Sequence, residues 1–309
     1  MFGIVGKARW LYAAAALVVA PVCAGCGVAS PAHPPGIVNA VGAENEYANV
    51  IHQIGGQYVH VTAIMNNPNT DPHSFEASPQ DARDVGLAQI VVQNGLGYDS
   101  FMTRLEQATP STQRTVIQAG RVLHLGKEVK NPHLFYMPGA MAKVAGRIAQ
   151  TLEKIQPQHR AYFARHLAAF QASLVPWQRT LTKIHRQFPG APVAVTEPVA
   201  DYMLQAAGLD VKTPWSFQAA VMNSTDPSPE AAAQVRALLK HRRVKVFVYN
   251  QQAVDSTTQA LLALAKQAGV PVVGVYETMP AGHTYQTWMQ AEATAVYEAL
   301  KTGRSSLTM

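Results

Sequence analysis

Residues 157–188, PQHRAYFARHLAAFQASLVPWQRTLTKIHRQF, contain almost no turn signal. A helix of about 30 residues, at about 1.5 Å rise per residue, spans roughly 45 Å and would cross a whole molecule. Pro176 should kink such a helix. The stretch therefore predicts one long helix that joins two parts of the chain. Its helical period is kept by Tyr162, Phe163, His166, Leu167, Phe170 and Leu174.

Short β-rich runs alternate with helical patterns on both sides of this stretch, and such alternation predicts βαβ units with parallel sheets. We expect an α/β protein of two lobes, 37–156 and 189–309, each a mostly parallel sheet with flanking helices, joined by a connecting helix over 157–188. The expected strands are 37–41, 58–65, 90–93, 115–118, 121–124, 192–196, 244–249 and 270–276. The expected helices are 44–54, 138–155, 198–207, 229–241, 256–268 and 284–301.

Residues 1–25 have the pattern of an export signal. Lys7 and Arg9 form a basic start, and the apolar stretch Leu11–Val22 that follows is too short for a comfortable membrane span. The Pro-rich segment within residues 26–36 is suited to a tether between a membrane and a folded domain.

The signal ends in CAGC at 23–26, and small residues before a cysteine are similar to a bacterial lipobox. We therefore expect a lipid on Cys26, although Cys23 stands where the lipobox usually has Leu. An ordinary signal peptide cut nearby, with Cys26 unmodified, is the alternative. No cysteine follows Cys26, so a bound metal must be held by His, Asp or Glu.

Composition limits the classes of partner. The chain has 309 residues, of which 48% are hydrophobic and 14% charged, and this composition suits one large or two smaller globular domains. The formal net charge is +6, and two of those charges lie in the expected export signal. Because there is no long Lys/Arg run, we expect no nucleic-acid partner.

Four residues of metal-ligand type lie past predicted strands. In open α/β sheets, ligands bind beyond the carboxyl ends of the strands. Two of the four come from the first lobe and two from the second, so a site between the lobes would receive all of them. They are His73 after 58–65, His133 after the strand ending near 124, Glu197 directly after 192–196, and Glu277 directly after 270–276.

This set has a coherent chemistry. Two neutral imidazoles and two carboxylates neutralise a divalent ion, and the mixture leans toward Mn²⁺ or Fe²⁺, with Zn²⁺ also feasible. Ca²⁺ would require six or more oxygen ligands. Taken singly, each residue is more often a packing or solvated side chain, so the prediction depends on the combination.

Three motifs resemble the metal-binding proteins of bacterial manganese/zinc ABC importers. DPHSFE (71–76) resembles that family's first ligand loop, NPHLF (131–135) its second, and QNGLGY (93–98) the segment between them. The resemblance runs from about residue 37 to the end. It implies a rigid two-lobed fold with the metal in the cleft, and His73, His133, Glu197 and Glu277 as ligands.

The same resemblance implies a role outside the cytoplasm. The protein would deliver its metal to a membrane permease driven by a separate ATPase. We expect a monomer, anchored by its lipid on the outer face of the cytoplasmic membrane or located in the periplasm.

The chain departs from the family pattern at several positions. Glu197 stands where His is frequent, Glu277 where Asp is usual, and Asn131 and Met137 where acids are common. No His-rich insertion precedes His133. The glutamate at the third ligand position and the missing insertion resemble the manganese-type members, which favours Mn²⁺.

Two other functions compete with metal capture. A metal-dependent hydrolase needs an open coordination position for water, and four ligands from four loops leave little room for one. The chain also lacks a GxSxG nucleophile motif. An adhesin or structural lipoprotein of the same fold is the other alternative.

Overall fold

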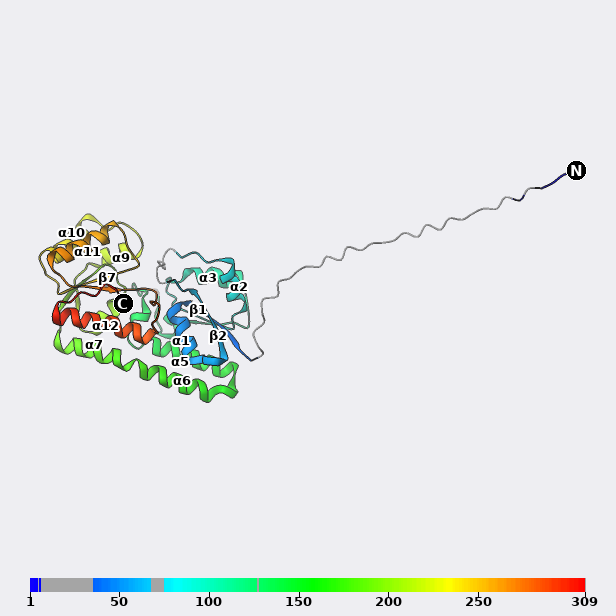
Figure 1. Ribbon diagram of the computed structural model, residues 1–309, viewed down its shortest axis with the longest axis horizontal. Coiled ribbons are helices and arrows are strands. Elements are labelled where there is room, and N and C mark those ends of the chain that lie inside the picture. Colours follow the sequence, from blue (N-terminus) through cyan, green and yellow to red (C-terminus); the bar gives the residue numbers. More distant parts are fainter. Residues whose placement is uncertain (5, 7–35, 68–74, 127, 309) are drawn as a thin grey trace. The chain divides into compact units, whose positions relative to one another are not determined.

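A computed structural model describes residues 1–4, 6, 36–67, 75–126 and 128–308 (Figure 1). Residues 1–4 and 6 contain no helix or strand, and the folded unit begins at Gly36. Cys26, His73 and nearly all of the expected signal and tether lie outside the described residues. No helix within these ranges is both long and apolar enough to cross a membrane.

The first sheet has four parallel strands in the order β2-β1-β3-β4. The strands are β1 (Val38–Glu44), β2 (Val59–Met65), β3 (Ile90–Gln93) and β4 (Thr115–Gln118). The chain runs outward from β1 in one direction to β2 and then in the other to β3. This reversal marks the edge between β1 and β3 as the place where an open α/β sheet binds ligands.

The second sheet repeats this arrangement in the order β6-β5-β7-β8, again with every pair parallel. Its strands are β5 (Pro192–Val195), β6 (Asp210–Val211), β7 (Val246–Asn250) and β8 (Val272–Val275). The side chains of β7 and β8 are buried throughout, as expected for strands covered on both faces. The predicted fold class, two mostly parallel sheets with flanking helices, is confirmed.

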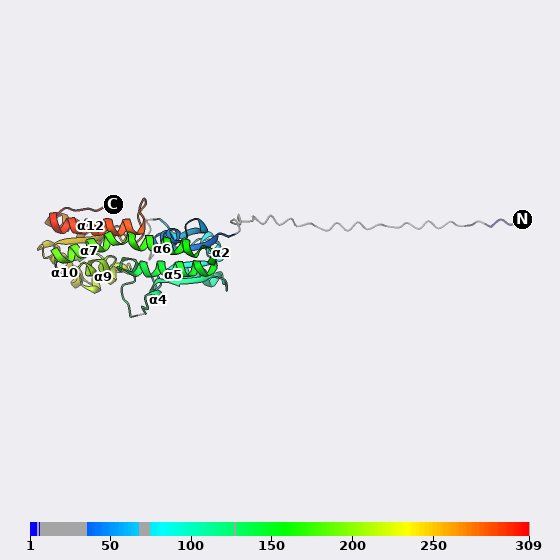
Figure 2. The same ribbon diagram turned by 90° about the horizontal axis from the view of Figure 1, so that it is seen from below.

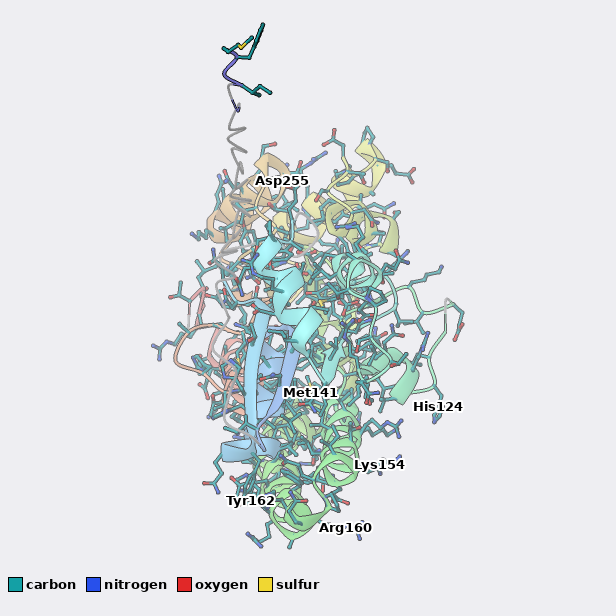
Figure 3. The ribbon with its side chains drawn as sticks, turned by 90° about the vertical axis from the view of Figure 1, so that its right-hand side faces the viewer. His124, Met141, Lys154, Arg160, Tyr162 and Asp255 are labelled. Atoms are coloured by element: carbon teal, nitrogen blue, oxygen red, sulfur yellow. The ribbon has the colours of Figure 1, made fainter. Side chains whose placement is uncertain are left out.

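Helices flank both sheets. Those up to the connecting segment are α1 (Asn45–Gly55), α2 (Pro79–Leu87), α3 (Ser100–Ala108), α4 (Ala119–Val122) and α5 (Ala140–Ile155). Those after it are α8 (Asp201–Ala206), α9 (Trp215–Met222), α10 (Pro229–Lys240), α11 (Ser256–Ala268) and α12 (Tyr285–Thr302). Figure 3 shows Asp255, which caps α11, at the opposite end of the folded unit from Arg160 and Tyr162.

The connecting segment is two successive helices, α6 (Arg160–Ser173) and α7 (Val175–Gln187). They meet at Leu174, two residues before Pro176, which has no N–H to continue the helical ladder. α6 packs on α1 of the first lobe, and α7 packs on α12 of the second (Figures 1 and 2). The predicted single helix is therefore broken near its expected kink and still runs from one lobe to the other.

One apolar core extends through both lobes. A single cluster of buried side chains includes Val92 of the first sheet and Val248 of the second. Tyr285 of α12 packs against both connecting helices, because the centre of its ring lies 6.3 Å from those of Phe170 in α6 and Trp177 in α7. Because such a core is close-packed, the two lobes are held against each other as one body.

One predicted element of the first lobe was wrong, and another begins later than predicted. The segment 121–124 is not a strand: α4 covers Ala119–Val122, and His124 then takes a left-handed conformation with φ of 58°. Leu125 N–H bonds back to the Gly120 carbonyl, so the chain turns instead of extending. The predicted helix at 138–155 begins later, at Ala140, after Gly139 with φ of 85°.

Candidate metal centre

His133 lies in the chain segment between α4 and α5 and is fully buried. Asn131 determines the orientation of its ring. The Asn131 amide nitrogen donates to the Pro198 carbonyl at 2.7 Å, so the Asn131 oxygen faces the imidazole. That oxygen lies 2.8 Å from His133 Nδ1 and also accepts the His133 backbone N–H at 3.0 Å. Nδ1 therefore carries the hydrogen, and Nε2 presents its lone pair.

Glu277 is also fully buried and lies in the loop after β8. Its Oε2 is 3.2 Å from His133 Nε2 and accepts a hydrogen bond from the Tyr98 hydroxyl at 3.3 Å. With Nδ1 committed to Asn131, a neutral imidazole and an ionised carboxylate at these two positions would face each other as two acceptors. This geometry is stable only with a cation, either a proton or a metal ion, between the two atoms.

Glu197 follows β5 and is 2% exposed. Asn250, the last residue of β7, links it to Glu277: the Asn250 amide nitrogen donates to Glu197 Oε1 and, at 2.7 Å, to Glu277 Oε1. β7 lies between β5 and β8, so a side chain at its end reaches both neighbours. The two carboxylates of the second lobe are therefore held side by side by one neutral amide.

The structure brings together three of the four predicted ligands to different degrees. His133 and Glu277 are in direct contact, and Glu197 joins them through Asn250. The fourth, His73, lies outside the described residues. Within the residues that are described, no three His, Cys, Asp or Glu side chains are arranged to hold a metal ion.

Sequence reasoning missed Asn250 and Tyr98 as contacts of the site. Asn250 carried the same signal as Glu197, because it is a polar residue at the carboxyl end of a β-rich run. Tyr98 lies in the QNGLGY segment but gave no separate sign of its role. Asn131, noted as a departure from the family pattern, orients His133.

Buried acids surround this centre. Burial raises the pKa of Glu46 to about 8, and the charges of Glu277 and Asp99 also raise it against the lowering effect of its own backbone N–H. Burial likewise raises the pKa of Glu44 well above its usual value, with Asp99 and Glu46 adding to the effect. Both raised pKa values favour the protonated form of these carboxyls and so limit the negative charge that they add to the centre.

Comparison with known proteins identifies the relatives of this chain. The family model for the periplasmic zinc-uptake complex component A matches residues 41–299. The manganese-binding lipoprotein MntA of Bacillus subtilis is 24% identical over 136 residues, which cover 42% of this chain and 44% of MntA. The metal ABC transporter substrate-binding lipoprotein FimA of Streptococcus parasanguinis is 21% identical over 265 residues, covering 80% and 82% of the two chains.

The fold matches as well. The periplasmic zinc-binding protein TroA from Treponema pallidum superposes with a TM-score of 0.72 at 18% identity, covering 88% of this chain and 100% of that one.

The family comprises substrate-binding proteins for metal transport and not enzymes, so the hydrolase and adhesin alternatives are not favoured. The predicted family and function class are confirmed. The chain belongs to the family of the zinc-uptake complex component A, the metal-binding solute-binding proteins of ABC importers.

Proposed function

We propose that the protein captures one divalent transition-metal ion outside the cytoplasm and delivers it to an ABC-type permease with a cytoplasmic ATPase. The matching family and the names of the relatives support this role. The continuous core and the two helices between the lobes support a rigid binding protein.

The proposed ligands are His73, His133, Glu197 and Glu277. The observation that carries this assignment is the 3.2 Å approach of His133 Nε2 to Glu277 Oε2, where a divalent ion would take the place of the proton that two facing acceptors otherwise share. Asn250 keeps the Glu197 carboxylate beside that of Glu277. His73 is included because its loop follows β2, whose carboxyl end lies at the same edge of the sheet as those of β1 and β3.

We propose Mn²⁺ as the preferred cargo, with Fe²⁺ or Zn²⁺ as the other candidates. Two carboxylates beside two imidazoles offer harder oxygen donors than an all-histidine set. MntA and TroA, named for manganese and zinc respectively, show that relatives of this fold differ in their metal. Because affinity generally rises from Mn²⁺ to Zn²⁺, the preference must be tested by the metal carried in the cell and not by affinity alone.

We further propose that Cys26 carries a lipid and that the segment 26–36 tethers the folded unit to the membrane. The proposal rests on the CAGC segment and on the relatives named as lipoproteins. The working form would be a monomer on the outer face of the cytoplasmic membrane or in the periplasm.

Thermal unfolding tests the capture function. A ligand that binds only the folded state at about a thousandfold excess over its Kd adds about 4 kcal/mol to the free energy of unfolding. For a chain of this size, that corresponds to a rise in Tm of about 10 °C. We expect Mn²⁺ and Zn²⁺ to raise the Tm of chelator-treated protein, and His133→Ala to abolish the rise.

Two outcomes of this experiment would contradict the proposal. One is an unchanged Tm across a panel of divalent metals, starting from protein verified to be metal-free. The other is an equal rise in His133→Ala and in the unchanged protein. Protein purified from its native export compartment without added metal should carry mostly manganese if the proposed preference is right.

A further inference from the structure

One face of α1 carries three uncharged amide side chains, spaced four residues apart, that contact the second lobe. Residues at i, i+4 and i+8 lie on the same side of a helix, so they form a row, here called the amide row. Its contacts are Asn45 with Met279, Asn49 with Tyr285, and Gln53 with Gln286. The amide row therefore joins the first lobe to the segment between β8 and the start of α12.

Asn45 makes a two-point contact within this row. Its Nδ2 donates to the Met279 carbonyl at 2.8 Å, and its Oδ1 accepts the Met279 N–H at 2.9 Å. One side chain thus satisfies both backbone groups of Met279, as a neighbouring strand would, and so restrains the loop in both position and orientation. Asn49 instead accepts a single hydrogen bond from the second lobe, from the Tyr285 N–H at 3.0 Å.

Met279 lies two residues after Glu277 on the same loop. On the other side of Glu277, the Tyr136 hydroxyl of the first lobe lies 2.7 Å from the Tyr276 carbonyl oxygen. The first lobe therefore holds this loop both before and after Glu277. Tyr136 is three residues from His133, so one short stretch of the first lobe carries both the imidazole and a contact to the Glu277 loop.

Asn45, at the start of α1, is held in place by the packing of its neighbours. Asn45 is flanked by Glu44 and Glu46, both fully buried. β1, which leads into α1, is the inner strand between β2 and β3. A shift of Asn45 would therefore disturb packed elements on both sides. The Glu277 loop is fixed to its own lobe by Gln252, whose side-chain oxygen accepts the N–H groups of Glu277 and Thr278, so the contact with Asn45 relates this loop to the first lobe.

We propose that Asn45 is a positioning residue of the metal site. It fixes the position of the Glu277 loop relative to the first lobe and so sets the distance between Glu277 and His133. This inference rests on the proposed function, in which Glu277 is a ligand. Among the described residues, the Asn45 side chain hydrogen-bonds to Met279 and to none of the predicted ligands, so we expect its effect on metal binding to pass through Glu277.

A purely structural role for Asn45 makes a different prediction. If the amide row only holds the lobes together, removing any of its hydrogen bonds should lower the Tm of the metal-free protein and leave the metal affinity unchanged. Asn49→Ala is the matched control, because it removes an interlobe hydrogen bond from the same helix face at a place six residues beyond Met279.

A double-mutant cycle on Mn²⁺ affinity separates these roles. The variants are Asn45→Ala, Glu277→Ala, the double variant and Asn49→Ala, measured by calorimetry and by the rate of metal loss to a chelator. We expect Asn45→Ala to weaken Mn²⁺ binding about tenfold, mainly through faster dissociation. In the Glu277→Ala background the same change should have no further effect, and Asn49→Ala should leave affinity within about twofold.

Asn45→Gln covers the case in which the alanine variant does not fold. It keeps both amide groups but moves them by one methylene, so it should also weaken binding only when Glu277 is present. An unchanged affinity in both Asn45 variants, or an equal loss with and without Glu277, overturns the positioning role alone. If Glu277→Ala itself leaves Mn²⁺ affinity unchanged, the ligand assignment fails and the inference falls with it.

Discussion

Glu277→Ala is expected to weaken metal binding by about tenfold or more, equivalent to about 1.4 kcal/mol or above. The substitution removes a proposed ligand and leaves the lone pair of His133 Nε2 without the carboxylate that it faces at 3.2 Å. Glu277→Asp should retain part of the affinity, because it keeps the charge but shortens the side chain by one methylene. Titration of chelator-treated protein with Mn²⁺ and Zn²⁺ provides the measurement.

Asp255→Ala is the control for this prediction. Asp255 lies in the preceding strand-to-helix loop and caps α11: its side chain accepts the Thr258 N–H at 2.7 Å, and the Thr258 hydroxyl accepts the Asp255 N–H at 2.9 Å. Its removal should lower the free energy of unfolding by about 1 kcal/mol and leave metal affinity unchanged. Loss of binding in Asp255→Ala, with binding intact in Glu277→Ala, would show that the fourth ligand lies on the Asp255 loop and not on the Glu277 loop.

Glu46→Gln is expected to stabilise the metal-free protein at alkaline pH. The Glu46 carboxyl is fully buried, and burial is the largest cause of its raised pKa. Its folded-state pKa of about 8 lies above the unfolded value of about 4.5, so the folded state binds more protons between these two pH values. The stability due to this proton is fully present below about pH 4.5 and is lost as the pH rises through 8.

The metal-free protein should therefore unfold more easily at pH 8.5 than at pH 6. Glu292, with a pKa raised by burial to about 8, contributes in the same direction. Glutamine at position 46 is neutral at every pH, so the variant should gain on the order of 3 kcal/mol relative to the unchanged protein near pH 9. Urea unfolding across this pH range measures the difference.

The exposed Glu230 supplies the control for this prediction, since Glu230→Gln should leave the pH dependence of unfolding as it is in the unchanged protein. If Glu46→Gln showed the same decline in stability between pH 6 and 9 as the unchanged protein, Glu46 would not be held protonated in the fold.

Much of the architecture was predictable because local patterns determine it. β3, β4 and α11 occur at the residues that their apolar runs and turn signals predict. Helices α2, α3 and α9 were not predicted, and all three are short, with eight or nine residues each. α2 buries only Val85, so little apolar period marks it in the sequence. α2 instead depends on a capping box at Ser78, which is formed with Asp81.

The candidate site was predictable only in part. Glu197 and Glu277 follow from the rule that places ligands beyond the carboxyl ends of parallel strands, and His133 from its motif. The contact between His133 and Glu277 joins residues 144 positions apart, and Tyr98 reaches Glu277 over 179 positions. Such contacts arise from the packing of one lobe on the other, which no local pattern encodes.

Anomalous diffraction from crystals grown with Mn²⁺ tests the central claim most directly. We predict one ion per chain between the lobes, bound by imidazole nitrogens of His73 and His133 and by carboxylate oxygens of Glu197 and Glu277, with distances of about 2.0–2.3 Å. An ion bound elsewhere, or no ordered ion at this place under saturating Mn²⁺, would contradict the proposed capture site.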